Sequence, residues 1–285
     1  MSVVIPAHDE APIIRRLLSR LIETDQEMRL QIVVVANGCT DGTARAAASV
    51  SPRIVVVEIS ETSKIDALNA GDKHATVFPR AYVDADVQVD APTLLALAEG
   101  LGDATPFLVA SPHLVTSTAK SSWPVRQYYK VWALSDFRTE GHIGSGVYAV
   151  SGEGRKRWGT FPDVIADDRF VQQQFDIHER LTLAADHAFV VEAPRDFATH
   201  IRRSTRIEAG NQQLPASLQQ VEQVGARTRY GHLVRRVARS PRLWAAFPVY
   251  CVGYLVPRLR ARRALVKGTL VAWNRDEASR ADAAR

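Results

Sequence analysis

Cysteine is scarce in this chain of 285 residues. Only Cys39 and Cys251 are present, which excludes a disulfide framework, a cysteine-based structural zinc set and a thiol redox pair. Cys39 has no histidine near it in the sequence, so we do not expect it to act as a nucleophile. The chain also begins on an apolar run without a basic region or a cleavage site, which predicts a cytoplasmic protein with no secretory signal.

Long apolar segments are missing as well. The apolar stretch 243–256 contains Pro248 and is shorter than the ~20 residues that a helix needs to cross a bilayer. Hydrophobic residues make up 46% of the chain and charged residues 24%, proportions that exclude wholesale disorder and fibrous architectures. The composition therefore predicts a globular protein with a sizeable core.

Acidic residues are few in the last third of the chain. Residues 200–285 contain 17 Lys and Arg against 5 Asp and Glu, whereas residues 1–199 contain 19 against 26. A basic tail of this kind suits nucleic acid, an anionic membrane or a phosphorylated ligand. Because nucleic-acid motifs with interleaved aromatic residues are absent, we do not expect nucleic acid as a partner.

Strand and helix patterns alternate through the first hundred residues. Apolar runs predict strands at 3–6, 32–36, 53–59 and 81–83, and helical spacing predicts helices at 11–22, 40–49, 64–74 and 91–100. The rest is mixed: helices are expected near 122–137 and over 215–239, and strands near 147–150 and 189–191. Uninterrupted Val and Ile runs belong to strands covered on both faces. The pattern predicts an α/β fold with a Rossmann-like, mostly parallel sheet and helices on both faces.

Polar residues cluster where three of these strands end. The clusters are 8–10, 37–41 and Asp84-Ala85-Asp86, and ligands of parallel sheets bind at the carboxyl ends of the strands. Asp84 and Asp86 can share a divalent cation, since Mg2+ and Mn2+ prefer oxygen ligands. The alternative is a solvated turn with an aspartate at a helix N-cap.

Four blocks, at 3–10, 32–43, 64–71 and 84–86, match in order and spacing those of the family 2 glycosyltransferases, which this sequence therefore resembles. The resemblance implies a GT-A fold, a nucleotide-diphospho-sugar donor, a divalent cation (Mg2+ or Mn2+) bound at the DxD motif, and inversion at the anomeric carbon. Because the sequence changes character after residue 200, we expect a catalytic domain over 1–210, with a nucleotide-sugar half at 1–105 and an acceptor half at 106–210. A basic helical extension would follow at 211–285.

The resemblance also implies roles for single residues of the first half. Those expected at the nucleotide are Pro6, Ala7, Glu10, Asn37, Lys64 and Asp84. Asn37 would face the base or ribose, Asp84 the ribose or metal, and Asp86 the metal and diphosphate. This chain departs from the family at Ala36-Asn37, where Asp-Asp is common, which leaves the identity of the base open.

The second half supplies a candidate base and acceptor residues. Asp168 resembles the general base of the family, and an acceptor hydroxyl must lose its proton as it attacks. Its neighbour Asp167 and the loop residues Gly144 and Ser145 are expected on the acceptor side. The alternatives are an aspartate N-cap on a helix and a simple turn.

The basic segment 200–206 is a third cluster. Arg203 and Arg206 are expected to offset the charge of the leaving diphosphate, because Arg suits phosphate through its bidentate fork. His200 is a candidate metal ligand, with a structural histidine as the alternative. The Gln-x-x-Arg-Trp block of processive synthases is absent, which favours transfer of a single sugar.

These observations predict an inverting glycosyltransferase that acts on a hydroxyl acceptor, lipid-linked or not, in cell-envelope, exopolysaccharide or glycolipid synthesis. A sugar nucleotidyltransferase is one alternative, but its Gly-rich first loop with Arg and Lys is missing at 7–10. A non-catalytic nucleotide-sugar binding protein is another. The apolar stretch 243–256 lies between basic clusters. It is expected either to lie on an anionic membrane surface or to fold back and pack on the catalytic domain.

Overall fold

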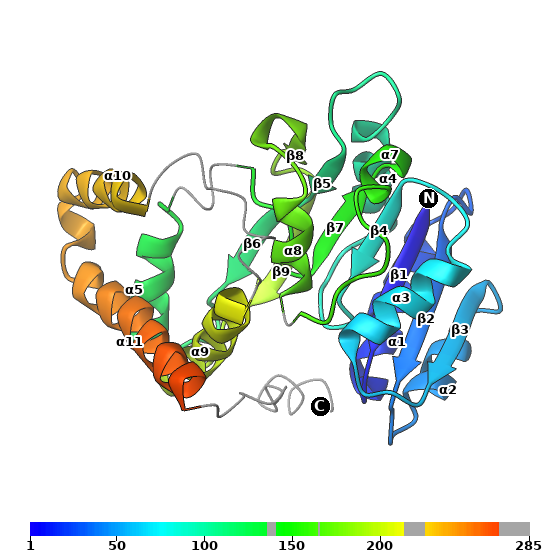
Figure 1. Ribbon diagram of the computed structural model, residues 1–285, viewed down its shortest axis with the longest axis horizontal. Helices are drawn as coiled ribbons and strands as arrows, with labels where there is room; N and C mark the ends of the chain where they lie inside the picture. The colour runs from blue at the N-terminus through cyan, green and yellow to red at the C-terminus, as the bar shows by residue number, and fades with distance from the viewer. Residues whose placement is uncertain (136–140, 165, 214–225, 268–285) are drawn as a thin grey trace. The chain divides into compact units, whose positions relative to one another are not determined.

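The computed structural model describes residues 1–135, 141–164, 166–213 and 226–267. Its contacts divide it into two compact units (Figure 1). Among the described residues, the first contains 1–115 and 143–191, and the second contains 116–135, 141–142, 192–213 and 226–267. The helix that spans residue 210 and an earlier helix, residues 123–132, both pack with the C-terminal helix in the second unit; the domain boundary at residue 210 stays a prediction.

The first unit is built on a seven-stranded sheet with the order β3-β2-β1-β4-β7-β5-β8. Its strands are β1 (Ser2–Ala7), β2 (Gln31–Asn37), β3 (Ile54–Ile59), β4 (Arg80–Val83), β5 (Val109–Ser111), β7 (Val147–Val150) and β8 (Arg180–Thr182). β7 runs antiparallel to both of its neighbours, and the other pairings are parallel. The prediction of a mostly parallel sheet is confirmed.

Helices flank this sheet. They are α1 (Ala11–Thr24), α2 (Thr43–Ala48), α3 (Lys64–His74), α4 (Ala91–Gly100), α7 (Gly152–Arg155) and α8 (Asp167–Gln173). The chain crosses from β1 to β3 in one direction and returns from β3 to β4. Right-handed crossovers therefore place α1 and α2 on one face and α3 on the other. The helix predicted at 40–49 begins only at Thr43, because the Asp41 side chain accepts a hydrogen bond from the Thr43 N–H (2.9 Å).

Short elements complete the first unit. A 3₁₀ turn, η1 (Ile177–Glu179), precedes β8, and β6 (His113–Ser117) pairs with β9 (Ala188–Glu192) in a two-stranded sheet. The predicted strands at 147–150 and 189–191 correspond to β7 and β9. β5, β6 and β8 had no sequence prediction, since they have only three to five residues each.

Helix α3 is fixed to the sheet at its C-terminal end. A Cβ on Gly71 would lie 2.3 Å from Cγ1 of Val4, so only glycine permits this approach. The Asp72 carboxylate pairs with Arg80 and Arg155 (2.5 Å each) and accepts a hydrogen bond from the Tyr82 hydroxyl (2.7 Å). The side chains of this network are 8–14% exposed where the ion pairs form, so it joins α3 to β4 and α7 in the interior.

The second unit is helical. It contains α5 (Trp123–Trp132), α9 (Phe197–Gln213), α10 (Ala226–Ala238), the 3₁₀ turn η3 (Pro241–Leu243) and α11 (Ala246–Val266). α11 packs against α9 and α5, around a cluster that includes Tyr128, Leu233 and Tyr250. No helix within the described part of the chain is long and apolar enough to cross a membrane.

Three predictions for segments of the second unit have different outcomes. The helix expected at 122–137 ends at Trp132, and residues 136–140 lie outside the described ones. Of the helix expected at 215–239, the described part is α10. The stretch 243–256 is not interrupted at Pro248, which lies in the first turn of α11, where a proline needs no helical N–H bond.

Candidate active site

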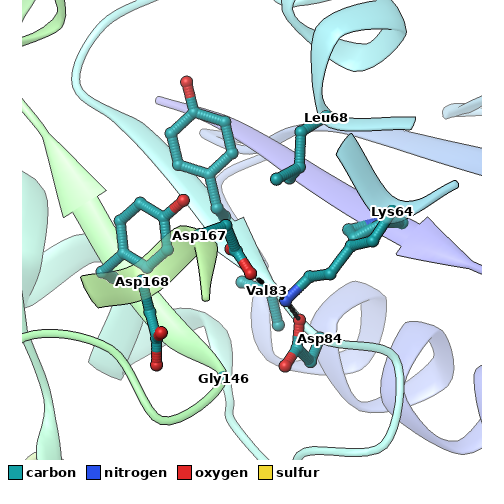
Figure 2. Close-up of a pocket in the computed structure, with 10 residues that line it drawn as sticks. Lys64, Leu68, Val83, Asp84, Gly146, Asp167 and Asp168 are labelled. Carbon is teal, nitrogen blue, oxygen red and sulfur yellow. Dashed lines mark ion pairs between the residues drawn. The ribbon is translucent and has the colours of Figure 1, made fainter. Parts of the chain in front are cut away.

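Lys64 is the first residue of helix α3. The Ser63 hydroxyl accepts a hydrogen bond from the Asp66 N–H (3.1 Å), which starts the helix there. A cation at a helix N-terminus is disfavoured by the helix dipole. Two carboxylates compensate, since the Lys64 Nζ lies 2.8 Å from Asp84 Oδ1 and 2.9 Å from Asp167 Oδ1 (Figure 2). Three separate segments of the chain thus meet at one ammonium group.

The charges of this group are set by burial and by each other. Burial alone would lower the pKa of Lys64, but Asp167 and Asp84 raise it above its usual value, so the ammonium stays charged. Burial raises the pKa of Asp167 to about 6, although Lys64 opposes the shift. The Asp167 side chain is 5% exposed, and its charge depends on the lysine.

Asp168 is held by backbone groups. Its Oδ2 accepts a hydrogen bond from the Ser145 N–H (3.1 Å), and its Oδ1 accepts one from the Arg169 N–H (2.7 Å). Helix α8 has Ala166 as its N-cap, so the alternative of an aspartate N-cap is wrong for Asp167 and Asp168. Asp167 binds Lys64 and Asp168 binds the loop, and Figure 2 shows the two carboxylates apart.

The loop before β7 makes this contact through an unusual backbone. Gly144, Ser145 and Gly146 have φ values of 112°, 59° and 101°, a region that side chains disfavour. A Cβ on Gly144 would lie 2.5 Å from Cβ of Asp168. The Gly146 carbonyl accepts a hydrogen bond from the Asp84 N–H (2.8 Å). The loop therefore hydrogen-bonds to both Asp84 and Asp168, whereas a simple turn would only reverse the direction of the chain.

One pocket collects these side chains. It is lined by Pro6, Lys64, Leu68, Tyr82, Val83, Asp84, Gly146, Tyr148, Asp167 and Asp168. Five residues chosen from the sequence thus lie together: Pro6, Lys64, Asp84, Asp167 and Asp168.

Tyr148 is a pocket residue that the sequence did not indicate. Its ring stacks on Tyr82 at 5.0 Å, and it is 2% exposed. Among the described residues its hydroxyl has no hydrogen-bond partner. Burial raises its pKa well above the ordinary value, so the phenol stays protonated. Tyr148 could have been indicated only by the pairing of β4 with β7, which places it beside Tyr82.

Asp84 and Asp86 follow β4. The Asp84 carbonyl accepts a hydrogen bond from the Val87 N–H (3.3 Å), which closes the turn between them, and the Asp86 side chain is exposed. Carboxylate oxygens on a tight turn are the ligands that Mg2+ and Mn2+ prefer. The residues therefore fit a hard divalent cation.

Four of the six residues expected at the nucleotide lie at or just after the ends of β1 and β2. Pro6 and Ala7 are buried, and the Glu10 N–H donates to the Thr43 hydroxyl (2.7 Å). Asn37 is 1% exposed, and within the described part of the chain its amide nitrogen has no hydrogen-bond partner. Buried donors are usually satisfied, so this amide can serve a ligand.

The basic segment at 200–206 lies on α9, in the second unit. His200 is 2% exposed and packs against the rings of Tyr128 (4.1 Å) and Phe197 (5.6 Å). Burial lowers its pKa to about 4, so the ring is neutral. These surroundings suit a structural histidine, and its metal role stays a prediction. Arg203 and Arg206 are half-buried, and their roles stay predictions as well.

The fold and pocket define a class of protein. A mostly parallel sheet with one inserted antiparallel strand, flanked by helices and continued by C-terminal helices, is the GT-A fold of glycosyltransferases. Residues 2–155, more than half of the chain, match the family described as glycosyl transferase family 2. The chain therefore belongs to glycosyltransferase family 2.

Several solved structures are similar to this chain. A mannosyltransferase from Pyrobaculum calidifontis, in complex with GDP-Man and Mn2+, is 24% identical with a TM-score of 0.61, over 99% of this chain and 82% of that one. A mycobacterial protein is 18% identical with a TM-score of 0.50, over 74% and 72%. A glucosyl-3-phosphoglycerate synthase from Mycobacterium tuberculosis is 18% identical with a TM-score of 0.49, over 68% and 72%. No curated protein matches the chain significantly.

Proposed function

We propose that this glycosyltransferase moves a single sugar from a nucleotide-diphospho-sugar to a hydroxyl acceptor, with inversion at the anomeric carbon. The observation that carries the proposal is the pocket in which Lys64, Asp84, Asp167 and Asp168 converge. It brings one ammonium group and three carboxylates together. That set suits displacement of an anionic leaving group by a hydroxyl.

Asp168 is the base in this mechanism. The Ser145 and Arg169 N–H groups fix the orientation of its carboxylate, and each oxygen keeps a lone pair for the acceptor. The carboxylate takes the hydroxyl proton while the acceptor oxygen bonds to the anomeric carbon, and the bond to the diphosphate breaks on the opposite face. Asp167 is already paired with Lys64, so it positions the lysine instead.

Positive charge stabilises the departing diphosphate. Lys64 supplies one ammonium group beside Asp84, and Arg203 and Arg206 are proposed to contribute from α9. Asp84 and Asp86 would hold Mg2+ or Mn2+, which is consistent with the Mn2+ named in the mannosyltransferase structure. Such an ion offsets charge on the diphosphate oxygens when it is bound.

The nucleotide is proposed to bind where β1 and β2 end. The buried Asn37 amide would donate to the base or ribose, with Pro6, Ala7 and Glu10 beside it. Each of these residues belongs to the first unit.

The acceptor is proposed to be lipid-linked and to belong to cell-envelope or glycolipid synthesis, which would bring the protein to a membrane surface. One face of α11 packs on α5 and α9, but Val252, Leu255 and Leu259, at helical spacing, are 49–54% exposed. Exposed basic side chains accompany them on α10, on η3, on α11 and directly after the two helices: Arg235, Arg239, Arg242, Arg260, Arg262, Arg263 and Lys267. Apolar side chains among basic ones suit peripheral binding to anionic lipid.

The test combines donor screening with a variant of the base. Thermal shifts of the purified protein with Mn2+ and a panel of nucleotide sugars identify the donor, and release of nucleoside diphosphate with hydroxyl acceptors measures transfer. Asp168→Asn should keep donor affinity and lower kcat at least about a hundredfold. Asp163→Asn is the matched control, because that aspartate is exposed near the same helix. Equal loss of donor affinity in Asp168→Asn would overturn its role as base.

A further inference from the structure

A mixed cluster of metal-ligating side chains lies at the ends of β1 and β2. His8 and Asp9 follow β1, and Cys39 follows β2. These strands are adjacent and parallel, with Ala7 opposite Ala36, so their loops meet although Cys39 and His8 are far apart in the sequence. One imidazole nitrogen, one carboxylate oxygen and the thiol sulfur all lie within 4.8 Å of one another. We expected no histidine near Cys39, and this expectation is wrong, because the fold brings His8 close to it.

His8 is oriented as a metal ligand would be. Its Nδ1 lies 2.5 Å from the Asn37 carbonyl oxygen, an acceptor, so Nδ1 carries the proton in this contact. The lone pair of the neutral ring is then on Nε2, which lies 3.7 Å from Asp9 Oδ2. A backbone carbonyl on one ring nitrogen is the usual second contact of histidines whose other nitrogen binds a metal.

Asp9 is fixed by the neighbouring loop. Its Oδ1 accepts hydrogen bonds from the Thr40 N–H (2.6 Å), the Thr40 hydroxyl (3.2 Å) and the Asp41 N–H (3.3 Å). Its φ of 47° is left-handed, a strained conformation outside glycine that such contacts must hold. With Oδ1 occupied by these donors, Oδ2 is the oxygen that faces His8.

Cys39 completes the cluster. Its Sγ accepts a hydrogen bond from the Asp9 N–H (3.4 Å) and is half-buried. Zinc binds sulfur at about 2.3 Å and nitrogen or oxygen at about 2.0–2.2 Å, so tetrahedral ligands lie about 3.3–3.7 Å apart. The His8–Asp9 separation already matches, and the others need side-chain shifts on the order of 1 Å.

We propose that His8, Asp9 and Cys39 bind a thiophilic divalent cation such as Zn2+, at a site separate from Asp84 and Asp86. The thiol proton passes to solvent as the sulfur–metal bond forms. A thiolate and an imidazole select Zn2+ or Co2+ over Mg2+, which requires oxygen ligands. Three protein ligands leave one coordination position for water or another ligand. The ion would cross-link the loops after β1 and β2.

Cobalt spectroscopy on the full chain tests the site. Co2+ should give a saturable near-ultraviolet absorption from thiolate-to-metal charge transfer, and Zn2+ should remove it. Cys39→Ser should abolish the absorption, whereas Cys251→Ser, the matched control, and Asp86→Ala should keep it. His8→Gln and Asp9→Asn should each weaken Zn2+ binding at least about tenfold in competition with a chromophoric chelator.

A second measurement uses the unmodified chain, so it tests the site even if the variants fail to fold. Bound Zn2+ should slow alkylation of Cys39 by iodoacetamide and leave alkylation of Cys251 unchanged, as mass spectrometry of the labelled peptides would show. The proposal is overturned if folded Cys39→Ser keeps the cobalt absorption, if saturating Co2+ gives none with the unmodified chain, or if Zn2+ protects neither cysteine.

Discussion

Replacing Lys64 by methionine isolates the charge balance of the pocket. The substitution keeps the aliphatic length of the side chain and leaves Asp84 and Asp167 without their shared cation. Removing one partner of a buried ion pair costs about 3–5 kcal/mol. Asp84 is 35% exposed and Asp167 is 5% exposed, so Asp167 carries most of the loss. We expect about 3 kcal/mol at pH 8, at the low end of the range for a buried pair. For a folding unit of this size, that loss lowers Tm by roughly 6–12 °C.

The pH dependence has a definite sign. When the pKa of a carboxyl is higher in the folded protein than in the unfolded chain, the protein becomes less stable as pH rises between the two pKa values. The pKa of an unfolded aspartate is near 3.9. For Asp167 this loss ends at about pH 6 in the unmodified protein, and without Lys64 it continues to higher pH. The difference between the two proteins therefore opens above about pH 6. At pH 5 it should shrink to at most about 1 kcal/mol, the contribution of a partly exposed pair.

Thermal unfolding at pH 5 and pH 8 measures this difference. Lys73→Met is the matched control, because Lys73 is exposed on the same helix, and it should change Tm little at either pH. Adding Asp167→Asn to Lys64→Met should recover stability at pH 8, since no buried charge is left unpaired. Equal loss at the two pH values, or none at pH 8, would refute the reasoning.

Other outcomes follow from the geometry. Asp86→Ala should abolish transfer, and so should excess chelator added to the unmodified enzyme. Full turnover of the variant would show that the carboxylate is not needed, and full turnover in chelator would show that the metal ion is not needed. Gly144→Ala should lower kcat at least about tenfold, because φ is 112° and the new Cβ meets Asp168 at 2.5 Å. Gly159→Ala, with no atom within 4 Å of its Cβ, should be silent. Co-sedimentation with anionic vesicles should be weak at low salt, lost at high salt, and reduced by Leu255→Ser; binding that survives molar salt would indicate insertion instead.

The sequence predicted the first half of the fold well because its periodicity is local. α3 and α4 have the expected bounds, and the strands differ by one or two residues. Strand pairing is not local: nothing in the residues near Val147–Val150 indicated that β7 inserts antiparallel between β4 and β5. That insertion brings Gly146 to Asp84. Five residues chosen from the sequence line one pocket, but the sequence did not indicate the contacts between them.

The expectation about the surroundings of Cys39 was wrong because strand pairing is not local. Cys39 and His8 were considered by sequence distance, and the adjacency of β1 and β2 cancels that distance. The boundary expected at residue 210 followed a change of composition. The structure groups α5, α9 and α11 in one unit, and composition carries no information about which helices pack together.

The anchoring of α3 makes the pocket depend on residues remote from it. Lys64 and Asp72 lie on the same helix, eight residues apart, which is about 12 Å along the axis. Arg80, Arg155 and Tyr82 hold the Asp72 side chain. The C-terminal end of the helix is therefore fixed in the interior, and the Lys64 ammonium group lies at the other end. Substitutions of Asp72, Arg80 or Arg155 at the fixed end would tilt or shift the helix. They would displace the Lys64 ammonium group although none of these three residues lines the pocket. A screen for lost activity should therefore recover substitutions of Arg155, a residue with no chemistry of its own in the reaction.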